Sequence, residues 1–269
     1  MSDGPVEEAC EVVVVEGADA TSLTDSQLSQ ALAPLEVGAA CWSLLLEPDG
    51  TFGDWVRVAR ESEDRWIVLG APGRAAAIAE RLGRFKLRER AAISTQWRSV
   101  SLTSEGRGAE GIELPVLWAG PGETEVLGGG AVAPGEPDAP SPLDRRRVSF
   151  GRLGPADLRP GDNPFAIGAE LLSDAVSFTK GCYTGQELVA RMDSRSATAP
   201  RRLFLATSER AAAVGEPLML DGREVGEVRS VSGGPRAICI VARSVPVPSD
   251  GEVTVGGVPV ALRQAAGSR

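Results

Sequence analysis

The C-terminal part of the chain consists of short β-rich runs that turn residues separate, and this pattern most constrains the fold. The runs are RRLFLATS, EPLMLDGREVGEVRSVSG, AICIVARS and EVTVGGVPVALRQ. Asp-Gly and Gly-Gly pairs interrupt them, and such pairs favour the tight turns of β-hairpins. Short strands joined by tight turns form small antiparallel barrels or sandwiches. The sequence therefore predicts a C-terminal β-module over residues 200–269.

The preceding residues, 1–199, predict a mixed α+β body. Runs of β-branched and apolar residues indicate strands, and apolar residues repeated every three or four positions indicate helices. We expect strands at 10–16, on both sides of a Pro48–Gly50 turn between 41 and 60, at 65–70 and at 93–102. We expect helices within 17–38, closed by Pro34 and Gly38, and within 71–90, ended near Gly83.

A segment rich in glycine and proline, residues 119–143, interrupts this body. Its sequence is AGPGETEVLGGGAVAPGEPDAPSPL, and these residues repeatedly stop a helix or a strand ladder. We therefore expect a flexible surface loop here. The run RRRVSFGRLG that follows at 145–154 is strand-like, so the chain is expected to return to the same body instead of starting a new domain.

The net charge of −9 disfavours a broad basic surface for nucleic acid, because phosphate neutralisation needs many cations. A local basic patch stays possible. No apolar run approaches the roughly 18 residues that span a bilayer. The N-terminus, MSDGPVEEACEVVVVEG, is acidic and lacks the features of a secretory signal. We expect a cytoplasmic protein with no membrane partner.

The chain has no histidine, so it lacks the commonest general base and metal ligand. Its chemistry must use carboxylates, thiols, lysines or a bound cofactor. The four cysteines, Cys10, Cys41, Cys182 and Cys239, are scattered without close pairs, and this spacing does not predict a metal site. Cys10, Cys41 and Cys239 lie inside strand-like runs and are expected in the core.

Cys182 differs because it lies in the run KGCYTGQE, residues 180–187, which we call the signature segment. Thr184 and Glu187 have the spacing of a capping box, so a helix is expected to begin at Gly185. The positive end of that helix and the nearby Lys180 would both stabilise a thiolate and lower the pKa of Cys182. This placement predicts a reactive thiol.

Other residues of the segment suit a binding site. Gly181 and Gly185 leave room for a ligand to approach the backbone, and Tyr183 offers a ring and a hydroxyl. A structural interpretation stands beside this one. A free cysteine is usually a small buried residue, Glu187 can serve only as a cap, and the glycines can serve only the turn.

The longer run AVSFTKGCYTGQELVAR resembles the signature of the YgfZ family of folate-binding proteins, whose hallmark is Lys-Gly-Cys-Tyr-x-Gly-Gln-Glu. The matching residues are Lys180, Gly181, Cys182, Tyr183, Gly185, Gln186 and Glu187. The runs VEGADATSL and LLEPDGTFGDW resemble the N-terminal half of the family. RRLFLAT and GEVRSVSGGPRAICIVARS resemble its C-terminal barrel, whereas segment 119–143 has no counterpart.

This resemblance implies a fold similar to the T-protein of the glycine cleavage system. Such a fold is α+β, with a folate-binding body of ferredoxin-like parts (1–199) and a small C-terminal antiparallel β-barrel (200–269). It also implies binding of tetrahydrofolate, or a related reduced folate, in a central opening. The implied role is assembly or repair of iron–sulfur clusters in client enzymes, especially radical enzymes that modify tRNA.

The resemblance implies a central role for Cys182. The cofactor-binding residues that we expect are Lys180, Gly181, Tyr183, Gly185, Gln186 and Glu187, with Arg191 and Arg195 as candidates for the glutamate tail of folate. The family commonly has a Thr-x-Asp pattern where this chain has Ser29-Gln30-Ala31, so one polar group near the opening is missing. Ser196 also replaces a common glycine.

Two other functions are compatible with this resemblance. The shared fold allows a folate-dependent aminomethyltransferase, although the T-protein pattern lacks the cysteine matched by Cys182. The protein could instead be a scaffold that docks a client enzyme without turnover. The signature segment favours the iron–sulfur role over aminomethyl transfer, whereas a thiol without measurable reactivity would favour the scaffold.

Overall fold

The computed structural model describes residues 6–86, 88–104, 110–115, 123–133, 140–194, 199–246 and 253–265. One antiparallel sheet of seven strands forms the body: β1 (Val6–Glu16), β2 (Ala40–Leu46), β3 (Phe52–Ser62), β4 (Arg65–Leu69), β5 (Ala92–Ser104), β6 (Gly111–Leu114) and β7 (Glu123–Gly128), in the order β2-β3-β4-β1-β5-β7-β6. The buried carboxylate of Glu125 on β7 pairs with the guanidinium of Arg57 on β3. This ion pair joins strands near opposite ends of the order, so the sheet is curled.

The valine run of β1 explains why this strand is central. Val13 and Val15 pack in the core cluster that contains the buried residues of the first two helices. Val12 and Val14 pack in a second cluster, with Val100, Leu127 and Leu143. Because successive side chains of a strand point to opposite faces, four consecutive buried valines place apolar layers on both sides of the sheet.

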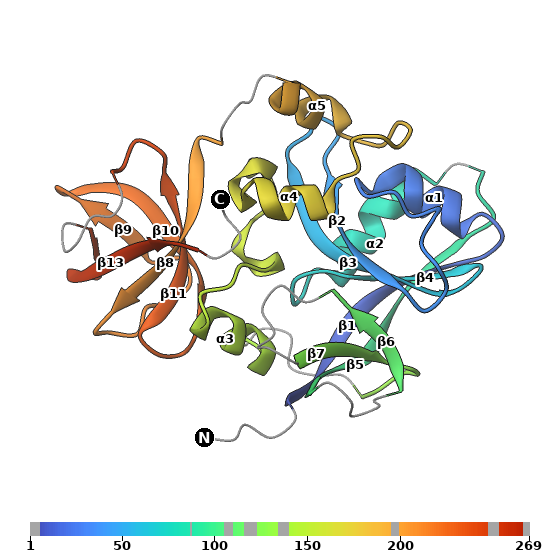
Figure 1. Cartoon of the computed structure of the whole chain (residues 1–269), viewed down its shortest axis with the longest axis horizontal. Coiled ribbons are helices and arrows are strands. Elements are labelled where there is room, and N and C mark those ends of the chain that lie inside the picture. The colour runs from blue at the N-terminus through green and yellow to red at the C-terminus, as the bar shows by residue number, and fades with distance from the viewer. Residues whose placement is uncertain are drawn as a thin grey trace.

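Helices cover the sheet and connect it to a barrel. Their bounds are α1 (Ala20–Gln27), α2 (Ala75–Arg84), α3 (Pro142–Ser149), α4 (Ala169–Ala175) and α5 (Gln186–Ser194), with 3₁₀ turns at Pro155–Asp157 and Pro164–Ile167. Figure 1 shows α3 and α4 between the barrel at the left and the sheet at the right. No helix in the described ranges is long and apolar enough to cross a membrane.

The C-terminal strands close into a barrel, as the spacing of the runs predicted. The strands are β8 (Arg201–Ser208), β9 (Pro217–Leu220), β10 (Arg223–Val231), β11 (Arg236–Ala242), β12 (Thr254–Val255) and β13 (Val258–Gln264), in the order β10-β11-β8-β13-β12-β9. Asp221 and Gly222 make the turn between β9 and β10, both with positive φ. The α+β class with a small antiparallel barrel is therefore confirmed.

The body and the barrel share a core and a buried polar joint. Leu203 and Ile240 of the barrel pack in one cluster with Trp55 of the sheet. The guanidinium of Arg147 on α3 donates to the carboxylate of Asp157 at 2.7 and 3.0 Å and to the hydroxyl of Ser230 on β10 at 2.9 Å. Burial of these groups in one network ties α3 to the barrel.

Two predictions about the N-terminal body are wrong. The helix expected within 17–38 ends at Gln27, because Leu28 turns extended and bridges Leu45, and Ser29 N donates to Leu44 O at 3.0 Å. The edge strand β2 thus takes up residues whose apolar spacing looked helical.

The second wrong prediction concerns segment 119–143 and the run after it. Residues 123–128 form β7, because Val126 and Leu127 bury their side chains while the strand pairs with β5 and β6. The strand-like run at 145–154 begins instead inside α3. Ser141 caps that helix by accepting from Asp144 N, and Pro142 occupies its first turn. Residues 116–122 and 134–139 lie outside the described residues.

Candidate functional site

The signature segment links α4 to α5 and lies against the C-terminal end of α1. Ser177 N, just before the segment, donates to Ser29 O at 2.9 Å, and Thr184 N donates to Ser26 O at 3.3 Å. The segment is therefore attached to the α1 end on both sides of Cys182. Helix α5 begins at Gln186, one residue after the predicted start.

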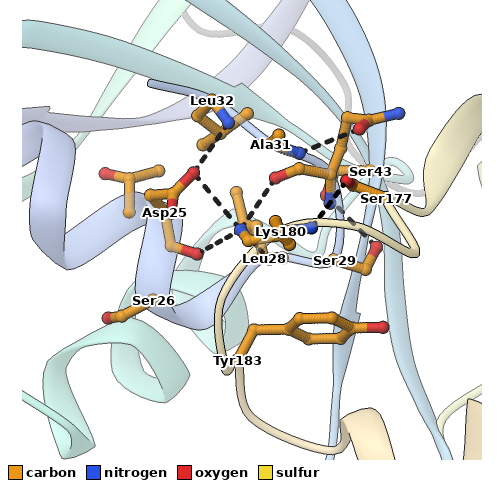
Figure 2. A network of polar contacts seen from close by, with 12 residues as sticks. Asp25, Ser26, Leu28, Ser29, Ala31, Leu32, Ser43, Ser177, Lys180 and Tyr183 are labelled. Carbon is orange, nitrogen blue, oxygen red and sulfur yellow. Dashed lines mark hydrogen bonds and ion pairs between the residues drawn. The ribbon is translucent and has the colours of Figure 1, made fainter. Parts of the chain in front are cut away.

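Lys180 makes the strongest of these attachments. Its ammonium donates to the backbone carbonyls of Asp25 at 2.6 Å, Leu28 at 2.9 Å and Gln30 at 2.9 Å, and lies 3.2 Å from the carboxylate of Asp25. Figure 2 shows this ammonium at the centre of the polar network. A lysine here satisfies carbonyls that the end of α1 leaves without helical partners.

This geometry corrects the expected role of Lys180. Its three N–H donors are directed to carbonyls of α1 and its extension, so hydrogen bonds to the backbone occupy the ammonium. Burial lowers the pKa of Lys180, and the carboxylate of Asp25 opposes that shift. The spacing of a lysine two residues before a cysteine could not reveal this, because the partners of Lys180 lie in a distant part of the sequence.

In the triplet Ser29-Gln30-Ala31 the two polar side chains form hydrogen bonds close to the signature segment. The hydroxyl of Ser29 donates to Ala175 O at 2.7 Å and accepts from Leu44 N at 2.8 Å. The amide of Gln30 donates to Asp174 O at 2.9 Å. This triplet thus joins the α1 extension to the end of α4, immediately before the signature segment.

The two glycines of the segment have different roles. Gly185 has φ of +82°, and a Cβ there would lie 2.5 Å from Glu47 O. Gly50, with φ of +84°, faces it: its own Cβ would lie 2.2 Å from Leu188 Cβ and 2.9 Å from Gly185 O. The β2–β3 turn and the start of α5 therefore interlock, and the turn fills the space that we expected a ligand to use at Gly185. Gly181 faces open space instead.

Cys182 is exposed, unlike the other three cysteines. Cys10 and Cys41 are half-buried and Cys239 is buried. Burial raises the pKa of Cys41 to about 12 and raises the pKa values of Cys10 and Cys239 as well. Cys182 is therefore the accessible thiol of the protein. A cysteine acts as a nucleophile or metal ligand through its thiolate, which a partner must be able to reach.

The polar contacts before α5 differ from the predicted capping box of Thr184 and Glu187. The Thr184 hydroxyl lies 3.5 Å from the side-chain oxygen of Gln27. The side-chain oxygen of Gln186 accepts from Tyr183 N at 3.3 Å. Glu187 is exposed on the first turn of α5. Thr184 is thus directed to the end of α1, and Gln186 holds the turn that precedes α5.

Tyr183 and the two predicted arginines complete the segment. Tyr183 is half-buried against the core cluster shared by body and barrel, and its ring lies 5.5 Å from the Lys180 ammonium. Burial raises the pKa of Tyr183 to about 12. Arg191 is exposed on α5, whereas Arg195 lies outside the described residues.

A cavity of about 80 Å³ lies elsewhere in the body, between β1, β3 and α3. Its lining includes Glu8, Cys10, Arg57, Trp97 and Leu143, but no residue of the signature segment. The carboxylate of Glu8 accepts from Leu143 N at 3.1 Å and from the Cys10 thiol at 3.4 Å, and burial raises its pKa.

The sequence patterns did not predict this cavity. Its one signal was that Glu8 is in phase with Val12 and Val14 on β1, so that a carboxylate falls on an otherwise apolar face. Nothing in the strand itself distinguishes a buried carboxylate from one at an open sheet end.

The fold is similar to that of a solved structure, the glycine cleavage system aminomethyltransferase T from Bartonella henselae. The TM-score is 0.70 with 16% sequence identity, over 98% of this chain and 86% of that chain. The chain matches no protein-family model. The T-protein-like fold that the signature segment implied is therefore confirmed as a fold.

Proposed function

We propose that this protein binds a reduced folate and supports the assembly or repair of iron–sulfur clusters in client enzymes, with Cys182 as the reacting thiol. The observation that carries the proposal is the exposure of Cys182 on a segment attached to α1 on both sides. The match of the signature segment to the YgfZ hallmark supports it. Client enzymes of the proposed class include radical enzymes that modify tRNA.

The contacts that hold the signature segment suit a reaction between Cys182 and a client enzyme. A thiolate can ligate iron or exchange with another thiol, and a hydroxyl near neutral pH can do neither. The Lys180 contacts and the Gly50–Gly185 interlock hold the segment, so that Cys182 keeps its position while a client approaches. Exposure of Gly181 beside it leaves that approach open.

The residues around the cavity fit part of a folate. Glu8 offers carboxylate oxygens for the amino groups of the heterocycle, Arg57 offers a guanidinium, and Trp97 offers a ring. The volume of about 80 Å³ is below the roughly 300 Å³ of typical ligand pockets. We therefore propose that the heterocycle end enters this cavity only if α3 or the 69–73 turn moves, while the rest stays outside.

Folate binding is tested by calorimetry with tetrahydrofolate on the wild type and on Glu8→Gln. We expect heat and a rise in melting temperature for the wild type, and weaker binding for the variant. The matched control is Glu7→Gln, an exposed neighbour on β1, which should bind like the wild type. Absence of heat and of a thermal shift for the wild type would contradict the folate part of the proposal.

The fold favours one alternative function, folate-dependent aminomethyl transfer, because a solved structure with a similar fold is an aminomethyltransferase. At 16% identity this likeness concerns the fold alone. Aminomethyl transfer has no need of an exposed thiol, so the two functions predict different results for a cysteine variant.

The proposed role of Cys182 is tested in a strain that lacks the gene. Cys182→Ser should melt within a degree or two of the wild type, since the side chain is exposed, but should not restore cluster-enzyme activity. Cys41→Ser is the control and should restore it. Full rescue by a folded Cys182→Ser variant would remove the thiol from the mechanism and favour aminomethyl transfer or a docking scaffold.

A further inference from the structure

We propose that the basic surface formed by Arg84, Phe85, Lys86 and Arg88 docks an acidic surface of a partner protein. These residues lie at and just beyond the C-terminal end of α2, and all four are exposed. For the identity of the partner, a client iron–sulfur enzyme, this proposal rests on the proposed function.

The charge of this surface is opposite to that of the whole chain, whose net charge is −9. The guanidinium of Arg84 forms an ion pair with the carboxylate of Glu80 on the same helix, at 3.4 Å. Lys86 and Arg88 make no ion pair with any residue that the structure describes. A small positive area on an acidic protein attracts an acidic partner there, while the remaining surface repels it and thereby fixes its orientation.

A chain of contacts joins the basic surface to the signature segment. The guanidinium of Arg81 lies 4.4 Å from the centre of the Phe85 ring and donates to the side-chain oxygen of Gln27 at 3.1 Å. The hydroxyl of Thr184 lies 3.5 Å from that same oxygen. The buried side chains of Arg81 and Gln27 therefore connect Phe85 to Thr184 of the signature segment.

An apolar side chain adds to this surface. The Phe85 ring is 36% exposed. Exposed aromatic rings among arginines are typical of the energetically important centre of protein–protein interfaces. The basic surface thus offers both an apolar contact and charge.

These features favour a protein over RNA. RNA binding through the backbone depends on neutralising many phosphates, and a surface that contacts only a few of them binds RNA weakly. Among the described residues of this surface only Lys86 and Arg88 make no ion pair, and the carboxylate of Glu89 accepts from Arg88 N at 2.9 Å. The rest of the chain repels a long polyanion. A compact acidic protein surface needs only the few contacts that are available.

The test measures binding to the purified apo form of a radical enzyme that modifies tRNA, from the same cell, at low and physiological salt. The variant K86E/R88E should bind at least about tenfold more weakly at physiological salt and lose most of its salt dependence. The control R201E/R223E reverses two exposed barrel arginines and should bind within about twofold of the wild type. Equal melting temperatures and equal alkylation of Cys182 establish that each variant is folded.

Three results would overturn the docking proposal: no binding by the wild type, no loss in K86E/R88E, or equal loss in both double variants. A fourth would as well, namely that K86E/R88E loses binding only to a single-stranded RNA homopolymer, which would make the surface an RNA site. Failure of the proposed function would give a different result: the wild-type protein would bind the client enzyme but would not restore its cluster activity.

Discussion

The ammonium of Lys180 donates to the backbone carbonyl of Asp25 at 2.6 Å, across 155 residues of sequence, and lies 3.2 Å from the carboxylate of the same residue. The Lys180 side chain therefore binds the backbone at the end of α1 and also pairs with the carboxylate of Asp25. The signature lysine acts here as a helix cap supplied from a distant segment, which positions the loop that carries Cys182.

Replacing Lys180 by methionine should lower the free energy of unfolding by about 2 to 4 kcal/mol, because it leaves carbonyls of Asp25, Leu28 and Gln30 without their buried donor. Urea unfolding followed by tryptophan fluorescence measures the change. Lys86→Met, at an exposed lysine, is the control and should change it by less than about 0.5 kcal/mol. Equal stability of the two variants would show that the cap is dispensable.

Gly185→Ala should destabilise the protein by more than about 1 kcal/mol. The new methyl group would meet Glu47 O, and the residue would have to keep φ of +82°. Gly181→Ala is the matched control in the same segment, with open space and no positive φ, and should be close to neutral. Thermal unfolding of both variants distinguishes them, and a neutral Gly185→Ala would contradict the interlock with Gly50.

Tyr183 is the chain's only tyrosine, so the ultraviolet absorbance of its phenolate reports one group. In the folded protein we expect the titration midpoint at about 12, compared with 10.0 for an ordinary tyrosine, because burial disfavours the anion. The folded state then holds the proton more tightly than the unfolded state. Its stabilising contribution is complete below pH 10 and is lost as the pH rises from 10 towards 12.

The control for this titration is the same protein in urea, where the midpoint should fall to about 10. Circular dichroism at each pH establishes that the protein remains folded. A midpoint near 10 in the folded protein would place the Tyr183 hydroxyl in water.

Arg147→Met should cost about 3 to 5 kcal/mol, because it leaves the fully buried carboxylate of Asp157 without its guanidinium partner. Arg145→Met, at an exposed position of the same helix, should be nearly neutral. Chemical unfolding measures both. A cost below about 1 kcal/mol for Arg147→Met would mean that the apolar core alone joins α3 to the barrel.

Local sequence patterns predicted those elements whose determinants are local. The valine run of β1, the turns of the barrel and the start of α5 all depend on residues next to one another. The end of α1 was missed because Leu28 is recruited by the free edge of β2, a tertiary interaction that overrides helical spacing. β7 was missed for a similar reason, since pairing with β5 and β6 outweighs its glycine-rich surroundings.

The candidate site shows the same division. The exposure of Cys182 followed from its place between glycines before a helix. The partner of Lys180 did not, because charge and sequence proximity indicated the cysteine while the folded chain brings Asp25 closer. The cavity beside Glu8 requires three elements to meet, and no single segment carries its signal.

The last barrel strand in sequence order, β13, closes the barrel. β13 lies between β8 and β12, so both of its edges are paired. During synthesis the other barrel strands are made first, and the edges of β8 and β12 that face β13 stay open until residues 258–264 have left the ribosome. A product that terminates before residue 258 would expose those edges to other nascent chains, so the synthesis of β13 is the step that protects the barrel from aggregation.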